Sequence, residues 1–129
     1  GDLRKLYADN TWFWPDGAAF FAESGRFRAW SGSGQKASYA LGMWWVNDHG
    51  SLCFDASWHS KDGAKESTTC FTHRQSGDVL YQKREPSGAW YVFRSNPVKL
   101  EDEIKKLKSG DLVEVKVQAV QAQLGTATP

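Results

Sequence analysis

Residues 41–71 read LGMWWVNDHGSLCFDASWHSKDGAKESTTCF, and this stretch decides the fold. Its residues 47–50, Asn-Asp-His-Gly, are typical of a type I turn followed by a glycine in the left-handed bulge position. Aromatic and β-branched side chains on both sides of the turn favour two antiparallel strands. The opposed pairs that this turn predicts are Val46 with Leu52, Trp45 with Cys53, and Trp44 with Phe54.

The next turn falls at residues 60–63, Ser-Lys-Asp-Gly. If all four residues form the loop, Cys53 lies directly opposite Cys70, where a disulfide fits the geometry. We predict that the two are bonded, with the Trp45 ring in van der Waals contact (without the bulge, Trp44 takes that place). Closing a loop of about eighteen residues would stabilise the fold by roughly 3 kcal/mol. A disulfide indicates a periplasmic or secreted protein, and two reduced cysteines in a cytosolic core are the alternative.

Side chains on these strands alternate between two faces. One face is predicted to form the main core, with Trp44, Val46, Leu52, Phe54, Ala56, Trp58 and Phe71. The other face carries polar side chains and the two cysteines at one end, namely Cys53, Asp55, Ser57, His59, Glu66, Thr68 and Cys70. At its other end this face is apolar, with Leu41, Met43 and Trp45. We expect another element to cover that apolar end.

The chain before residue 41 continues the pattern of short strands and turns. Leu3, Leu6 and Tyr7 are spaced for one or two helical turns. A two-residue turn at 24–25 is predicted to place Glu23 opposite Arg26. That register aligns four side chains on one core face, namely Phe20, Ala22, Phe27 and Ala29.

The C-terminal third is predicted to hold one helix. Residues 85–88, Glu-Pro-Ser-Gly, first give another type I turn with a left-handed glycine. Asn96-Pro97 then supplies a cap and a first-turn proline, and apolar residues repeat at 100, 104 and 107. This helix, near 98–108, is the expected cover. A last strand over 112–118 and a loose tail over 119–129 follow, so the expected domain is 3–118.

Composition excludes several classes of protein. The 129 residues carry 16 Lys+Arg and 15 Asp+Glu, a net charge of +1, which excludes a dedicated nucleic-acid binder. No apolar run is long enough to span a membrane. The two cysteines and three histidines lack the spacing of a metal site, and no cofactor motif is present. The chain begins with Gly1 and no initiator Met, so we expect that a signal peptide was removed.

Several short motifs taken together resemble a known family. They are Leu6-Tyr7, Asn10-Thr11, the Gly17–Gly25 hairpin, Gly42-x-Trp44, Leu52-Cys53-Phe54, Cys70 and Gly110-Asp111. Over roughly residues 3–112 the chain resembles the small secreted bacterial proteins of the domain-of-unknown-function family number 995. This resemblance implies export to the periplasm and a small β-rich fold, and it brings no established activity. The Gly42-x-Trp44 motif also resembles that of lipocalin-like barrels, where it lies near the N-terminus rather than in mid-chain.

The expected fold is therefore mainly β. It is an antiparallel β-meander or a lipocalin-like barrel of about 8–9 strands, with a short N-terminal helix and one C-terminal helix near 98–108.

Seven tryptophans are too many for one small core to hold without partial exposure of some. Exposed aromatic side chains can stack on sugar rings or bind an apolar ligand in a barrel mouth. Trp12 and Trp14 share one strand face, and Trp30 shares a face with Arg26 and Arg28. These five are the predicted ligand-binding residues, and the three tryptophans are predicted to be exposed. The alternative is that most tryptophans fill the core and seal its ends.

Asp55, His59 and Glu66 share one face of the predicted sheet, which suggests an acid–base role. Asp55 and His59 lie four residues apart, roughly 13 Å on a strand, which is too far for a hydrogen bond. A solvated polar face explains them better, and a hydrolase that uses them is our third hypothesis. We expect no catalytic residues.

The leading hypothesis is a non-enzymatic periplasmic or secreted domain that binds a small apolar or glycan ligand. The alternative is a cell-envelope interaction, assembly or inhibitor module that acts through a sheet edge or a Trp patch.

Overall fold

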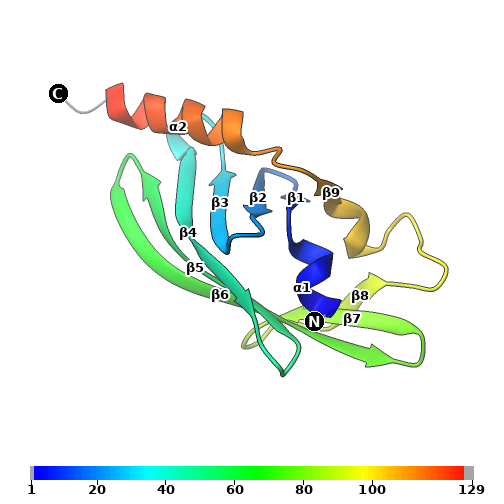
Figure 1. Cartoon of the computed structure of the whole chain (residues 1–129). Helices are drawn as coiled ribbons and strands as arrows, with labels where there is room; N and C mark the ends of the chain where they lie inside the picture. The colour runs from blue at the N-terminus through cyan, green and yellow to red at the C-terminus, as the bar shows by residue number, and fades with distance from the viewer. Residues whose placement is uncertain (1, 127–129) are drawn as a thin grey trace.

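Figure 1 shows the computed structural model, which describes residues 2–126. These residues form one antiparallel sheet of nine strands in the order β8-β7-β6-β5-β4-β3-β2-β1-β9. The strands are β1 Asn10–Trp14, β2 Gly17–Phe21, β3 Arg26–Ser31, β4 Ser38–Val46, β5 Ser51–Ser60, β6 Gly63–Ser76, β7 Val79–Arg84, β8 Tyr91–Arg94 and β9 Leu107–Ser109. The helices are α1 Asp2–Tyr7 and α2 Glu114–Thr126, with 3-10 turns η1 Gly34–Lys36 and η2 Glu103–Lys106. The mainly β class, the meander and the short N-terminal helix are confirmed.

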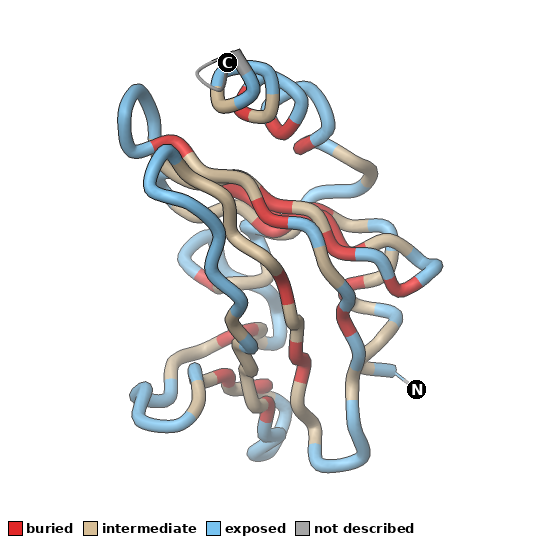
Figure 2. The backbone as a smooth tube through the Cα atoms, turned by 90° about the vertical axis from the view of Figure 1, so that its left-hand side faces the viewer, coloured by how far each residue is buried: buried red, intermediate tan, exposed pale blue. Residues whose placement is uncertain are grey.

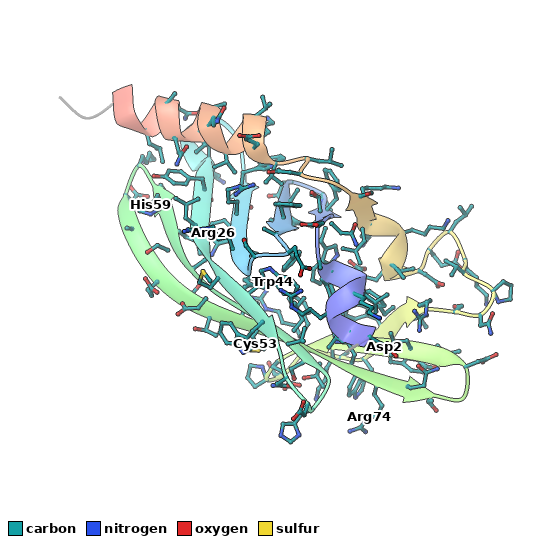
Figure 3. All side chains as sticks on the ribbon, viewed as in Figure 1. Asp2, Arg26, Trp44, Cys53, His59 and Arg74 are labelled. Carbon is teal, nitrogen blue, oxygen red and sulfur yellow. A yellow bond between two sulfur atoms is a disulfide. The ribbon has the colours of Figure 1, made fainter. Side chains whose placement is uncertain are left out.

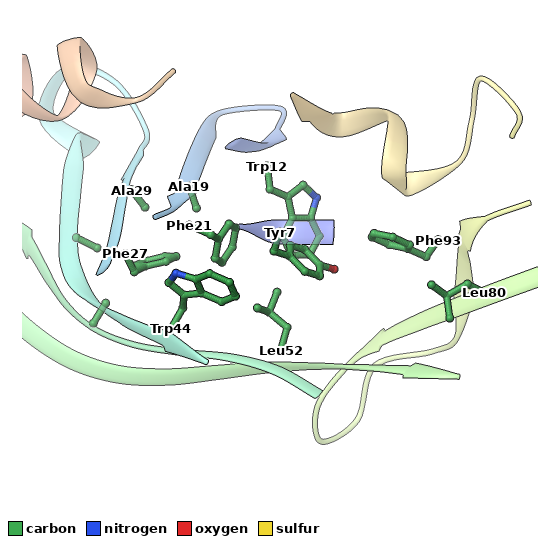
Figure 4. Packing of buried hydrophobic residues seen from close by; sticks show 12 residues of the cluster. Tyr7, Trp12, Ala19, Phe21, Phe27, Ala29, Trp44, Leu52, Leu80 and Phe93 are labelled. Atoms are coloured by element: carbon green, nitrogen blue, oxygen red, sulfur yellow. The ribbon is translucent and has the colours of Figure 1, made fainter. Parts of the chain in front are cut away.

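The sheet curls into a half-barrel, and its concave face holds the main core (Figure 1). Tyr7 of α1 packs there with Phe21 and Phe27, and all three side chains are fully buried (Figure 4). Figure 2 shows that buried residues follow the strands and the side of α2 toward the sheet, while exposed residues gather at the turns. The curl therefore gathers aromatic side chains from distant parts of the chain on one face.

The register of strands β4, β5 and β6 agrees with the prediction from residues 41–71. Trp45 lies opposite Cys53, and Gly50 adopts φ +81°, the left-handed conformation of the expected bulge. Cys53 lies opposite Cys70, and the two form a disulfide. Residues 60 and 63 also pair, so the loop proper is only residues 61–62. The predicted core face of these strands is confirmed, whereas the contact between the Trp45 ring and the disulfide stays a prediction.

The register predicted for the hairpin of β2 and β3 is wrong by one residue. Ala22, rather than Glu23, pairs with Arg26 through the Ala22 N–H and the Arg26 carbonyl, 2.9 Å apart. The turn has three residues, 23–25, rather than the predicted two. Gly25 adopts φ +97°, a left-handed conformation that accommodates the longer turn. The predicted core residues Phe20 and Ala22 thus lie on the convex side, and Phe21 points to the core instead. Both are buried, so the hydrophobic pattern of β2 does not distinguish the two registers.

The turn predicted at residues 85–88 is also wrong. Strand β7 ends at Arg84 and β8 begins at Tyr91, so the connection is longer than a four-residue turn. Gly88 is not in the left-handed region and instead donates its N–H to the Arg84 carbonyl at 2.8 Å.

The helix predicted near 98–108 does not form. The segment folds as η2 and the short strand β9, which pairs with β1. The Asp102 carboxylate accepts hydrogen bonds from the backbone N–H groups of Ser95 and Lys99 and from the Ser95 hydroxyl, at 2.7–3.0 Å. These bonds hold a compact turn, and Leu100, an expected core residue of the helix, is 87 % exposed.

The C-terminal helix lies further along the chain, where a strand and a loose tail were predicted. Asp111 accepts hydrogen bonds from the N–H groups of Val113 and Glu114 at the start of α2. Val113, Val117 and Val120 are buried at helical spacing, whereas Val115, which strand alternation would bury, is 81 % exposed. Residues 119–126 thus continue α2 rather than forming a tail, and the rest of the predicted tail, 127–129, lies outside the described residues.

Helix α2 covers only part of the convex face. It packs on Ala18 and Phe20 of β2, and its contacts extend to β3 and β4. The apolar end of that face is left uncovered: Leu41, Met43 and Trp45 are 40–50 % exposed. No helix within residues 2–126 is long and apolar enough to cross a membrane.

Candidate ligand cavity

A cavity of about 460 Å³ opens on the concave face of the half-barrel. Seven strands, all but β4 and β9, and η2 contribute to its wall. The lining side chains are Trp12, Trp14, Ala19, Phe21, Phe27, Ser31, Phe54, Trp58, Ser67, Thr69, Phe71, Arg84, Tyr91 and Glu103. Most of the wall is therefore aromatic.

The aromatic part of the wall is fixed by ring packing. Phe27 and Phe54 stack with centroids 4.4 Å apart, and the Trp12 and Phe71 rings meet edge to face at 4.9 Å. The Trp12 indole N–H also donates to the Glu103 carboxylate at 2.9 Å, which fixes the orientation of the ring. Side chains held in this way give a preformed apolar surface rather than one that must be ordered by a ligand.

The other part of the wall is polar and comes from β6, β7, β8 and η2. Ser67 and Thr69 place hydroxyl groups beside the aromatic rings, and Arg84 and Glu103 bring opposite charges. Glu103 is already paired, because Lys106 Nζ lies 3.0 Å from its carboxylate. Within residues 2–126, by contrast, no side chain forms an ion pair or hydrogen bond with the Arg84 guanidinium.

Behind Tyr91, a buried chain of hydrogen bonds connects the cavity wall to α1. The Tyr91 hydroxyl donates to the Gln82 amide oxygen, and the Gln82 amide nitrogen donates to the Tyr7 hydroxyl at 2.7 Å. The Tyr7 hydroxyl and His73 Nε2 are also 2.7 Å apart. His73 Nδ1 lies 3.0 Å from the Gly50 carbonyl, which can only accept, so Nδ1 carries the proton and Nε2 accepts from Tyr7.

Burial keeps this network neutral. It lowers the pKa of His73, with a smaller opposing effect from the hydrogen bond to Gly50. Burial also raises the pKa of Tyr7 well above its usual range, and burial together with the charge of Glu103 raises the pKa of Tyr91 to about 12. All three groups are therefore uncharged at neutral pH. They support the cavity wall from behind.

Two of the five predicted ligand-binding residues lie in the cavity. Trp12 and Trp14 both line it, but Trp12 is only 7 % exposed, so its predicted exposure is wrong. It is buried because the curl brings Phe71 and Glu103 against it.

The other three predicted ligand-binding residues are on the convex face. Lys116 of α2 lies over the Trp30 ring, 4.8 Å from its centroid. Arg28 forms an ion pair with Asp111 at the start of the same helix. Arg26 is exposed and lies opposite Met43 in the ladder (Figure 3). Trp30 and Arg28 thus hold α2 on the sheet.

The candidate acid–base group gains no support from its placement. Asp55, His59 and Glu66 are on the convex face, and none of them lines the cavity. His59 stacks on Tyr39 at 4.7 Å, and Glu66 accepts a hydrogen bond from Ser57 at 3.0 Å. Among residues 2–126, no group of three or more His, Cys, Asp or Glu side chains could hold a metal ion.

Sequence reasoning missed the polar side chains of the cavity wall, which are Ser31, Ser67, Thr69, Arg84, Tyr91 and Glu103. Ser67 and Thr69 carried a usable signal, because they alternate with Phe71 along one strand and so share its predicted face. The position of Arg84 depends on the pairing of β6 with β7. Tyr91 is the first residue of β8 and follows an irregular connection, and Glu103 belongs to η2, so no periodicity predicts that either reaches the cavity.

Comparison with known proteins gives a family but no relative of known function. A search of curated proteins found no match, and a search of solved structures found none either. The family model described as protein of unknown function (DUF995) matches residues 1–113, which include all nine strands of the described sheet. The chain therefore belongs to the DUF995 family of proteins of unknown function.

Proposed function

We propose that this protein binds a small, mainly apolar ligand in the concave cavity. The observation that carries the proposal is a space of about 460 Å³ walled by aromatic rings. The space opens on the concave face of the half-barrel, so a ligand can enter it from solvent. Its volume lies within the range of about 300–1,000 Å³ that is typical of small-molecule sites.

The mixed character of the wall supports the same function. Ligand sites usually combine an apolar lining with a few placed polar groups. Here Ser67, Thr69 and Arg84 form such a group beside the aromatic rings. A binder rather than an enzyme is supported because Tyr7 and His73 are buried behind the wall and hydrogen-bonded to each other, and neither lines the cavity.

A periplasmic or secreted location is part of the proposal. It is supported by the Cys53–Cys70 disulfide, because such bonds persist in oxidising compartments. In that setting the ligand would reach the protein outside the cytoplasm.

The neutral fluorescent probe N-phenyl-1-naphthylamine tests the binding function. We expect it to bind with one-to-one stoichiometry, with enhanced probe emission and quenched tryptophan emission, because three tryptophans line the cavity. Ser67→Trp should abolish binding by filling the cavity, and Thr69→Phe serves as a second, smaller block. Circular dichroism establishes that both variants are folded.

Trp45→Ala is the matched control, because Trp45 is exposed on the convex face. It should bind the probe as the unmodified protein does. If neither blocking variant weakens binding, or if the unmodified protein does not bind the probe, the cavity is not a ligand site.

A second candidate function is a cell-envelope interaction module. The exposed apolar strip of Leu41, Met43 and Trp45 favours it, since exposed apolar patches mark protein contacts. Under this proposal Trp45→Ala would abolish capture of one specific envelope protein, and Ser67→Trp would leave that capture unchanged.

A further inference from the structure

The polar rim of the cavity contains one charge that the protein itself does not balance. Arg84 is the last residue of β7 and lies opposite Phe71, so its side chain is on the concave face. It lines the cavity and is exposed to solvent, which places it at the mouth. Within the described residues its guanidinium has no carboxylate or hydrogen-bonding partner.

We propose that the ligand is a small apolar organic acid whose carboxylate or sulfonate group binds Arg84 while its apolar part fills the aromatic cavity. This inference rests on the proposed ligand-binding function and specifies the chemical class of the ligand. The planar guanidinium of arginine offers paired N–H donors that match such an anion.

The charge balance of the cavity favours an anion over a neutral molecule or a cation. Glu103, the one acidic residue in the wall, is compensated by Lys106 at 3.0 Å and by the Trp12 indole N–H at 2.9 Å. The unpaired charge is therefore positive. A ligand that fills the cavity displaces water from around Arg84, and a desolvated charge is costly unless it is paired.

The hydroxyl groups of the wall add donors at the same place. Thr69 lies two residues before Phe71 on β6, so it is the diagonal neighbour of Arg84 on the concave face. No other side chain within residues 2–126 bonds to the Thr69 hydroxyl, which can therefore donate to the anion. The anionic group is thus expected at the β6–β7 side of the mouth.

Two matched probes separate the charge from the apolar part of the ligand. The probe 1-anilinonaphthalene-8-sulfonate contains the same ring system as N-phenyl-1-naphthylamine and adds one sulfonate. We expect Arg84→Met to weaken binding of the sulfonate about 10- to 100-fold, the loss of a charge-assisted hydrogen bond. Binding of the neutral probe should change less than twofold. Arg84→Gln is the second variant, in case Arg84→Met does not fold.

Arg26→Met is the control, since it removes an exposed arginine from the opposite face of the sheet. It should leave both probes unaffected. The inference is overturned if sulfonate affinity falls less than twofold in the Arg84 variants, if both probes weaken equally, or if Arg26→Met has the same effect. Failure of the neutral probe to bind the unmodified protein would instead overturn the proposed function itself.

Discussion

The two faces of the sheet bury apolar side chains in different ways. On the concave face the curl brings rings together directly, as with Trp12 and Phe71, whose centroids are 4.9 Å apart although 59 residues separate them. On the convex face side chains diverge, and burial there depends on a separate element, α2. Beyond the part of the convex face that α2 covers, Met43 is half exposed. Curvature therefore gathers most of the core on one face, where Tyr7 of α1 completes it, and leaves burial on the other face dependent on α2.

The largest expected effect is the loss of a concave-face ring. Phe21 is fully buried and contacts Tyr7, Phe27, Trp44 and Phe54. Phe21→Ala should lower the free energy of unfolding by about 3–5 kcal/mol, measured by urea denaturation. The matched convex-face variant, Met43→Ala, should cost less than about 1 kcal/mol. Equal losses would contradict the distinction between the faces.

The disulfide is the next largest contribution, and it lies on the convex face. Cys53 and Cys70 close a loop with a sequence separation of 17 residues. Reduction, or the double variant Cys53→Ala/Cys70→Ala, should lower the free energy of unfolding by about 3 kcal/mol. Probe binding at the concave cavity should stay unchanged under native conditions. If the reduced protein were as stable as the oxidised one, the disulfide would have no stabilising role.

Removing contacts between α2 and the sheet should have a smaller effect. Val117 is 3 % exposed and packs on the Ala18 and Phe20 side of the sheet. Val117→Ala should cost about 2 kcal/mol, through lost burial and the small cavity that is left. Val115→Ala on the exposed side of the same helix is the control and should be nearly neutral. Hydrogen exchange should show where stability is lost, because the backbone amides of α2 should exchange faster than those of β5.

A pH dependence is the smallest expected effect and belongs to the concave face. Burial lowers the pKa of His73, so the folded protein binds this proton less well than the unfolded chain does. The resulting stability is complete above the ordinary histidine pKa of 6.5 and is lost as the pH falls toward the folded value. Urea midpoints between pH 7.5 and 5.5 should therefore decrease on acidification. His73→Gln should reduce the change of the urea midpoint with pH, whereas His49→Gln, at an exposed turn, should not.

The centre of the sheet was predictable because local chemistry determines it. Gly50 sets the bulge, and the bulge sets which residues oppose each other from Val46 to the disulfide. The N-terminal helix followed from the spacing of Leu3, Leu6 and Tyr7 in the same local way.

The errors occurred where two periodicities fit the same residues. Phe20 and Phe21 are both buried, so β2 fits either register. Val113, Val115 and Val117 alternate as in a strand, but the first and third also fit a helix, and Asp111 as the cap decides between the two.

The cavity could be predicted only in part. Trp12 and Trp14 were found from strand alternation. Arg84, Tyr91 and Glu103 meet only because the sheet curls and the chain crosses from β8 to β9, and local sequence patterns contain no information about that crossing.

The half-barrel leaves two strand edges, β8 and β9, and their construction bears on how readily a strand of another molecule could pair with them. An open sheet exposes unpaired backbone groups that can recruit a strand from another molecule. Here the edge strands are the shortest of the described sheet, with four residues in β8 and three in β9. The segment that joins them, held by Asp102 to Ser95 and Lys99, packs η2 beside β8. Short edges give an incoming strand few groups to pair with, and the crossover that supplies Glu103 to the cavity also shields the β8 edge.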